Sequence, residues 1–397
     1  MINIKLISVL AFLVRFSFIM IAPERPITLD DASSWDNVAY NIISGMGFIE
    51  SNGQPTYFRL PVYPLFLGSI YYIFGHNYFI AKAANSIVDS ITVVILMLIA
   101  FKAFNDSTIS VITGILLAIY PPLLVYNGII GTEILYTFLL SLSIYLLMYK
   151  RYMISGIVMG VATQCRSTTI LFPFFFLILY FLLNKEKTFK VNLKKALAFV
   201  IPFIIILLPW SIRNYRVFDV FTPVNVGAGH LFWSGTSIEL KGMHAIGGKN
   251  DLGNVYPELQ KYSMMKRDQI AFEKGFENIY RHPFGFIKLT AKKFIWFLFQ
   301  PVGQVLAEKF SPAAGKLLYF PHTLLVLLAG AGIYFSRGAF RALLPVTSIL
   351  LYFTIMHSII STIPRYRLPI EPYILLFAVY SVFYIHNKYF RKGVMLT

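Results

Sequence analysis

The sequence predicts an all-α polytopic membrane protein with about ten transmembrane helices and two long outer-face loops that contain interfacial helices. Of the 397 residues, 57% are hydrophobic and only 13% are charged, and the mean hydropathy is +0.66. Soluble chains carry about 25% charged residues, so this chain lacks the polar side chains needed to cover a water-facing surface. The aromatic content of 17% is typical of proteins with aromatic belts at the membrane interfaces.

The spans are predicted from runs of apolar residues, because a helix needs about 20 of them to cross the hydrocarbon core. The expected spans are residues 4–22, 79–101, 108–126, 133–149, 152–165, 168–184, 195–210, 319–336, 342–360 and 368–386.

The distribution of charge sets the orientation. With the N-terminus inside, the cytoplasmic segments contain two acids, Asp106 and Glu186. Their cations are Lys5, Lys102, Lys150, Arg151, Lys185, Lys187, Lys190, Lys194, Lys195, Arg337, Arg341, Lys388, Arg391 and Lys392. This excess follows the positive-inside rule. The net charge of +17 is therefore a topology signal, and we expect no binding to nucleic acid.

Three regions follow from these spans. Residues 1–210 form an N-terminal transmembrane region whose first outer loop is 23–78, and residues 319–397 form a C-terminal one. The outer-face region 211–318 lies between them. Long ordered loops are usually functional, so both outer segments are candidates for the active site.

Each outer loop contains predicted helices. In the first loop, the apolar spacing predicts an interfacial helix over 35–44, followed by an apolar stretch, 62–75, that is too short to span. In the second, we expect an amphipathic helix near 257–280 and a basic, aromatic helix over 284–300. The helix over 284–300 can either lie at the membrane interface or span the membrane. Its three lysines are expected to share one face: Lys288, Lys292 and Lys293.

Polar side chains gather at the predicted outer boundary. Asp30, Asp31 and Asp36 stand between the first span and the interfacial helix, where a carboxylate can either cap the helix or serve in catalysis. Further charged residues lie near the outer ends of other spans: Arg59, Glu133, Arg166, Arg213, Arg365 and Arg367. Arginines that converge with carboxylates on one side describe a pocket for an anionic phosphate and an acid–base centre.

A series of motifs resembles the glycosyltransferases of the GT-C fold, which include the protein O-mannosyltransferases and the lipid A aminoarabinose transferases. The motifs are Asp31–Phe48, Arg59–Leu67, Tyr120–Pro122 with Thr132 and Glu133, Gly156–Gly160 with Arg166, Pro209–Tyr215, Leu231–Gly235 and Pro364–Pro372. There are departures from the family pattern. Trp35 stands where Tyr is usual, Val62 replaces a Gly, and Ser167 stands where the family often has Pro.

The resemblance implies a membrane glycosyltransferase that moves a sugar from a polyprenyl-phosphate donor to a hydroxyl acceptor on the non-cytoplasmic face, with inversion. It implies that Asp31 is the single general base and that Glu133 is a second acid, which either binds sugar hydroxyls or holds a metal. The alternative for Glu133 is that it caps its span beside Thr132. The implied donor-phosphate ligands are Arg59, Arg166, Arg213, Arg365 and Arg367. The implied substrate-pocket residues are Asp30, Trp35, Tyr63 and Tyr366.

This chemistry needs few groups. Polyprenyl phosphate leaves as a stable anion without a general acid, so one carboxylate base can take the proton of the acceptor hydroxyl. Cations then stabilise the charge that builds on the phosphate. A glycosidase differs, because it places two carboxylates about a poor leaving group. Since Pro364 and Pro369 favour an extended segment, Arg365 and Arg367 are expected to point the same way.

Partners and location follow the same interpretation. The expected partners are a polyprenyl-phosphate-sugar donor lipid, a glycan, lipid or protein acceptor, and the bilayer of a bacterial or archaeal cell membrane, with the active site facing outside. The seven His show no His-x-x-x-His spacing and Cys165 is the single cysteine, so no zinc site is expected. The sequence neither requires nor excludes a divalent cation near the phosphate.

The alternative function is a polytopic transporter or a flippase for lipid-linked sugars. It predicts charged residues near the bilayer midplane, and Arg15, Asn85 and Asp89 are the exceptions to an otherwise one-sided polar distribution. A lone charge at that depth costs at least about 2.5–3.5 kcal/mol, so we expect Arg15 and Asp89 to form a buried ion pair. Asn85, one turn outward from Asp89, can accept or donate a further hydrogen bond. The functional alternative is that Arg15 reaches the donor phosphate.

Overall fold

The computed structural model describes residues 4–21, 31–183, 189–240, 242, 252–302 and 312–391. Within these ranges the regular structure is helical, apart from one isolated bridge between Ile49 and Pro55. The predicted all-α membrane fold is confirmed. The chain forms two compact units: the first comprises Met1–Leu207, Thr323–Leu350 and Leu368–Thr397, and the second comprises Leu208–His322 and Leu351–Arg367.

Six of the described helices are long and apolar enough to cross a membrane. Two of them are α1 (Ile4–Ile21) and α4 (Tyr78–Phe104). The other four are the helical stretches Lys190–Phe218, Gly315–Phe335, Arg337–Ile359 and Pro364–Tyr389. These four contain α10 (Phe189–Phe218), α17 (Tyr319–Phe335), α18 (Phe340–Ile359) and α19 (Glu371–His386), respectively. Each matches one of the predicted spans. The span predicted over 108–126 is a pair, α5 (Ser107–Ala118) and α6 (Pro121–Asn127), bent by 48°. The chain is therefore a multi-pass membrane protein.

The remaining predicted spans are shorter apolar helices: α7 (Glu133–Met148), α8 (Tyr152–Cys165) and the stretch Ser167–Leu183, which includes α9 (Phe172–Leu183). The non-spanning stretch is α3 (Val62–Phe74), and the interfacial helix before it is α2 (Ala32–Ile43). In the second unit, the predicted outer helices are α13 (Met264–Arg281) and α14 (Pro283–Phe299). The other described helices are α11 (Ala228–Thr236), α12 (Leu252–Val255) and α16 (Pro312–Leu317).

Side-chain caps explain where two helices of the first unit begin. The Asn77 side chain accepts hydrogen bonds from the backbone N–H groups of Phe79 and Ile80 at the start of α4. Asp106 does the same at the start of α5, with the N–H groups of Thr108 and Ile109. Both residues supply acceptors for N–H groups that have no partner within their helix.

The bend between α5 and α6 has a chemical cause in the sequence. In a continuous helix, the carbonyls of Leu117 and Ala118 accept from the N–H groups four residues on, but those positions are Pro121 and Pro122, which have none. Arg15 of α1 donates to both carbonyls, with Nη1 3.0 Å from the Ala118 oxygen and Nη2 3.2 Å from the Leu117 oxygen. The Leu117 oxygen also accepts from the Tyr120 N–H at 3.3 Å. The break is thereby satisfied from a neighbouring helix, as membrane interiors require.

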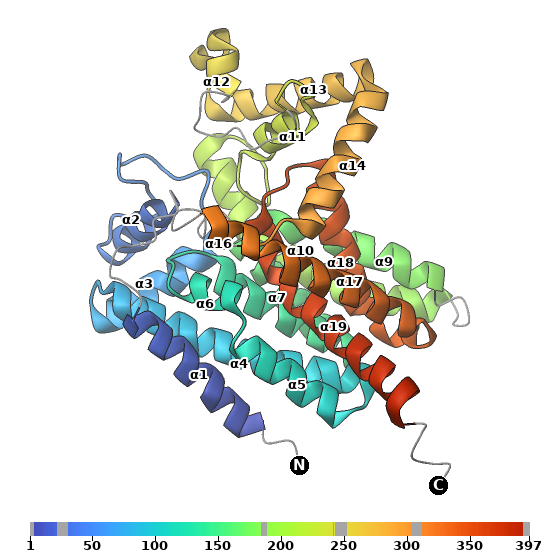
Figure 1. Cartoon of the computed structure of the whole chain (residues 1–397). Coiled ribbons are helices and arrows are strands. Elements are labelled where there is room, and N and C mark those ends of the chain that lie inside the picture. The colour runs from blue at the N-terminus through green and yellow to red at the C-terminus, as the bar shows by residue number, and fades with distance from the viewer. Residues whose placement is uncertain are drawn as a thin grey trace. The chain divides into compact units, whose positions relative to one another are not determined.

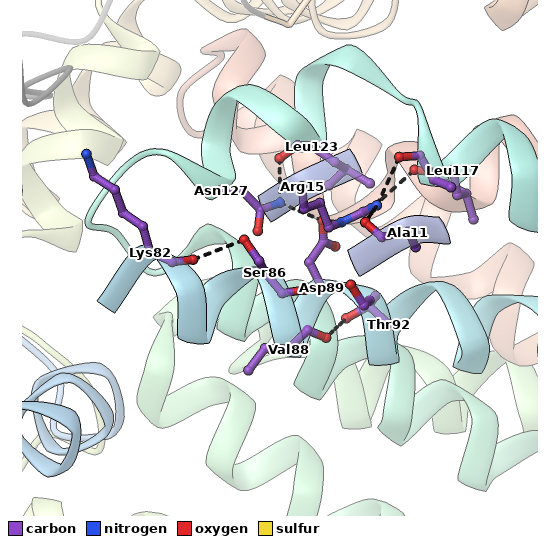
Figure 2. A network of polar contacts seen from close by, with 12 residues as sticks. Ala11, Arg15, Lys82, Ser86, Val88, Asp89, Thr92, Leu117, Leu123 and Asn127 are labelled. Carbon is purple, nitrogen blue, oxygen red and sulfur yellow. Dashed lines mark hydrogen bonds and ion pairs between the residues drawn. The ribbon is translucent and has the colours of Figure 1, made fainter. Parts of the chain in front are cut away.

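The charge of Arg15 is balanced by Asp89 of α4, and the predicted ion pair is confirmed. Arg15 Nε lies 2.6 Å from Asp89 Oδ2, and both side chains are completely buried. Asn127 of α6 donates to the same carboxylate oxygen at 2.7 Å. Asn85, one turn outward from Asp89, donates through Nδ2 to the Ile129 carbonyl. Figure 2 shows Arg15, Asp89 and Asn127 converging, where α1, α4 and the α5–α6 pair lie side by side (Figure 1).

Two glycines allow α8 to pack closely against α10 within the first unit. A Cβ at Gly156 would lie 2.1 Å from the Phe199 carbonyl oxygen, and one at Gly160 would lie 2.7 Å from Ile206 Cβ. Small residues four apart are a common device for close helix packing in membranes. The Gly156–Gly160 motif is thus explained by packing in this structure.

The buried network of Arg15 makes a prediction about stability. Arg15→Met should destabilise the protein by roughly 3–5 kcal/mol, because it leaves Asp89 charged and unpaired in the interior. The double variant Arg15→Met/Asp89→Leu should recover part of that loss, since no buried charge remains. Thermal melting of the purified protein in detergent measures both. Lys102→Met, at an exposed cation of α4, is the control, and single variants as stable as wild type would contradict the prediction.

Candidate active site

The predicted base, Asp31, lies directly before α2 and is paired with Arg59. Arg59 Nη2 is 3.1 Å from Asp31 Oδ1, and the Asp31 side chain stays 45% exposed. Arg59 also donates through Nε to Ser34 Oγ at 2.8 Å, and its guanidinium carbon lies 4.5 Å from the centre of the Trp35 ring. Asp31 is therefore a carboxylate that is paired with Arg59 and accessible to solvent.

Asp36, five residues further along, has a different environment. Its Oδ1 accepts from the Tyr71 hydroxyl at 2.6 Å and contacts His76 Nε2 at 2.8 Å, and its Oδ2 accepts from the Tyr78 hydroxyl at 2.8 Å. These partners come from α3, from the turn after it and from the start of α4. Asp36 is buried, so its contacts fix α2 to the neighbouring helices.

A second carboxylate–arginine pair joins α7 to the end of α8. Arg166 Nη1 lies 2.7 Å from Glu133 Oε1 and 3.3 Å from Thr132 Oγ1. The Glu133 side chain is only 2% exposed. A Cβ at Gly131 would lie 2.6 Å from Glu133 Oε2, so a larger residue here would displace the Glu133 carboxylate.

Two predicted pocket residues, Trp35 and Tyr63, contact each other, and Trp35 also contacts Arg59. The Trp35 ring meets the Tyr63 ring edge-on, with 5.5 Å between their centres, while Arg59 covers Trp35. The structure therefore brings together four of the predicted site residues of the first unit through direct contacts: Asp31, Trp35, Arg59 and Tyr63. Asp30 lies outside the described residues.

The predicted phosphate arginines of the second unit differ from one another. Arg213 lies over the rings of Trp210 and Phe218, at 4.7 and 4.9 Å from their centres. Arg365 is half-buried on a 3-10 helix, Pro364–Ile370. The expected extended segment is wrong: at about three residues per turn, side chains two apart point in different directions, so Arg365 and Arg367 do not share a face.

Arg367 is fully buried at the end of α14. Its guanidinium donates to the Leu298 carbonyl at 3.0 Å and the Gln300 carbonyl at 2.8 Å, and also to the Phe297 carbonyl. It contacts His322 Nε2 at 2.8 Å. These carbonyls end a helix, where a cation is favourable. The structure thus gives Arg367 a capping role, while Tyr366 packs its ring against that of His357 with 5.0 Å between centres.

Sequence reasoning missed the partners of Asp36. His76 and Tyr78 stand in the short polar segment between two apolar helices, and that position was the signal that could have found them. In the part of the chain that the structure describes, no group of three or more His, Cys, Asp or Glu side chains is placed to hold a metal ion.

Asp31, directly before α2, and Asp36, within α2, should respond differently to neutralisation. Asp36→Asn should lower the free energy of unfolding by about 2 kcal/mol, because hydrogen bonds to a buried charge are lost. Asp31→Asn should change it by less than about 1 kcal/mol, since a partly exposed ion pair contributes little. Melting of both purified variants tests this, and equal losses would show that the two environments have been misjudged.

Comparison with known proteins gives three results. Residues 54–212 match the family model of dolichyl-phosphate-mannose-protein mannosyltransferases. No curated protein sequence matches the chain significantly. Two crystal structures of ArnT from Cupriavidus metallidurans are similar at 14% identity, covering 95% of this chain and 77% of ArnT. The TM-score is 0.44 for the form bound to undecaprenyl phosphate and 0.46 for the apo state.

The family match covers Arg59, Tyr63, Glu133 and Arg166 of the first unit, which are among the residues that carried the resemblance in the sequence. It supports a membrane glycosyltransferase as the class of protein. Over residues 54–212 the chain matches the dolichyl-phosphate-mannose-protein mannosyltransferases, and the predicted resemblance to glycosyltransferases of the GT-C fold is confirmed.

Proposed function

We propose that this protein transfers a sugar from a polyprenyl-phosphate donor to a hydroxyl acceptor on the non-cytoplasmic face of a bacterial or archaeal cell membrane, with inversion at the anomeric carbon. The observation that carries the proposal is the contrast between Asp31, directly before α2, and Asp36 within it. Asp31 is half-exposed and held by one arginine, whereas Asp36 is buried among three donors. Of these two, only Asp31 is available to a substrate.

Asp31 acts as the general base in this proposal. The positive charge of Arg59, 3.1 Å away, favours the ionised carboxylate, which is the form that can accept a proton. As the acceptor oxygen attacks the anomeric carbon, Asp31 takes its proton and the bond from that carbon to the phosphate oxygen breaks. The electron pair leaves with the polyprenyl phosphate, so no general acid is needed.

The remaining predicted residues take supporting roles. Arg59 and Arg166 in the first unit are proposed to stabilise charge on the leaving phosphate. Arg213 and Arg365, which belong to the second unit, keep their predicted role as ligands of a phosphate group. Glu133 is proposed to bind sugar hydroxyls, with its carboxylate oriented by Arg166 at 2.7 Å. Because Arg367 is engaged by carbonyls of α14, we assign it no direct contact with the donor.

The transporter alternative loses its main support. It depended on charges near the bilayer midplane, and Arg15 and Asp89 form a pair with no exposed surface. Arg15 also donates to the carbonyls of Ala11, Leu117 and Ala118. A structural role for this pair therefore agrees with the contacts, and a direct contact between Arg15 and the donor phosphate does not.

The test of the proposal is the loss of turnover in Asp31→Asn. General base catalysis contributes about 10²–10⁴-fold, so kcat should fall by at least about a hundredfold while donor binding is retained. Mass spectrometry of the lipid-linked sugars that accumulate in a deletion strain identifies the donor for the assay. Asp30→Asn is the matched control. Wild-type kcat in Asp31→Asn, with loss in Asp30→Asn, would move the base by one residue.

A further inference from the structure

Lys293 of α14 is a buried cation that the proposed chemistry does not use. We predicted that Lys288, Lys292 and Lys293 share a face, and this is wrong for Lys293. Its side chain is completely buried, in line with Leu289 and Phe297 at helical spacing. Lys288 and Lys292 are exposed on the other side of the helix. A lysine is rarely buried without a partner, so its surroundings require an explanation.

The partners of Lys293 are backbone carbonyls from two other elements. Its Nζ lies 2.7 Å from the Gly235 oxygen near the end of α11, and 2.8 and 3.4 Å from the oxygens of Ile359 and Ile360 at the end of α18. Carbonyls at helix C-termini lack intrahelical partners and attract cations. Burial lowers the pKa of Lys293 to about 8. The ammonium therefore ties three elements of the second unit together.

At Gly235, the backbone of α11 contacts the backbone that follows α18. A Cβ at this position would lie 1.2 Å from the Ile360 carbonyl oxygen, so α11 rests directly on the backbone that follows α18. Ile360 is thus held from two sides, by the backbone at Gly235 and by Lys293.

Ile359 and Ile360 begin the segment that leads to Arg365, and Arg367 closes it. Lys293 binds the carbonyls at its start, and Arg367 donates to the carbonyls of Leu298 and Gln300 at the end of α14. The segment 359–367 is therefore fastened to one helix at both ends. Its middle is fixed as well, because Thr362 Oγ1 donates to the His357 carbonyl at 2.6 Å.

We propose that Lys293 and Arg367 are positioning residues for Arg365: they fix both ends of the segment 359–367 to α14 and so hold the Arg365 guanidinium ready for a phosphate group. The inference rests on the phosphate role proposed above for Arg365. A guanidinium fixed in advance loses less conformational entropy when it binds, which is the advantage of a preorganised site. Neither Lys293 nor Arg367 contacts the ligand itself.

The experiment measures binding of undecaprenyl phosphate, and of undecaprenol as the phosphate-free lipid, to the full-length protein in detergent. Arg365→Gln should weaken undecaprenyl phosphate binding by about tenfold or more, since it removes a charge-assisted contact. Lys293→Gln should weaken the binding of undecaprenyl phosphate about five- to tenfold and leave the binding of undecaprenol unchanged. Lys292→Gln, at the adjacent exposed lysine, is the matched control and should change neither.

A double-mutant cycle decides whether Lys293 acts through Arg365. In an Arg365→Gln background, Lys293→Gln should have no further effect on undecaprenyl phosphate, because coupled residues are not additive. An equal loss for both lipids, or the same fold-loss with and without Arg365, would overturn the positioning role. If Lys293→Gln does not fold, Thr362→Val carries the same test with the same expected pattern. Full binding by Arg365→Gln alone would instead reject the phosphate role.

Discussion

The structure of the first unit depends on one constraint: a helix broken inside a membrane must have its free carbonyls satisfied. Pro121 and Pro122 remove the donors that Leu117 and Ala118 would use, and Arg15 replaces them across a helix interface. The cation then requires an anion, which is Asp89, and Asp89 in turn holds Asn127 on the far side of the bend. Two prolines thus account for a charged network that joins α1, α4, α5 and α6.

In the second unit, buried cations likewise donate to carbonyl groups at the ends of helices. Lys293 and Arg367 both direct their charge at carbonyls, and neither has a carboxylate among the contacts described above. The first unit uses cations differently around α2 and α7, where Arg59 and Arg166 face Asp31 and Glu133. Burial separates the clearest cases: Lys293 and Arg367, enclosed by carbonyls, stabilise the fold, whereas the Asp31 carboxylate beside Arg59 is 45% exposed and accessible to solvent.

Much of this organisation was predictable from the sequence, and the part that was not has identifiable causes. Apolar runs located the spans, and the cost of a lone charge in the membrane identified the pair of Arg15 and Asp89. The capping role of Arg367 could not be predicted from its residue type, because its partners are backbone groups about seventy residues away in the sequence. The motifs identified Asp31 and Arg59 as site residues but did not predict that they contact each other, because the two positions are 28 residues apart.

The shortness of α7 and α8 has a consequence for the depth of the chemistry. At about 1.5 Å per residue, helices of 16 and 14 residues are about 24 and 21 Å long, against roughly 30 Å of hydrocarbon. Glu133 begins α7, and Arg166 directly follows α8. If α7 and α8 cross the membrane, the charged pair of Glu133 and Arg166 lies closer to the bilayer midplane, or the bilayer is thinner around it. A donor lipid would then meet its arginines without lifting its headgroup into water, and the acceptor would have to descend to it.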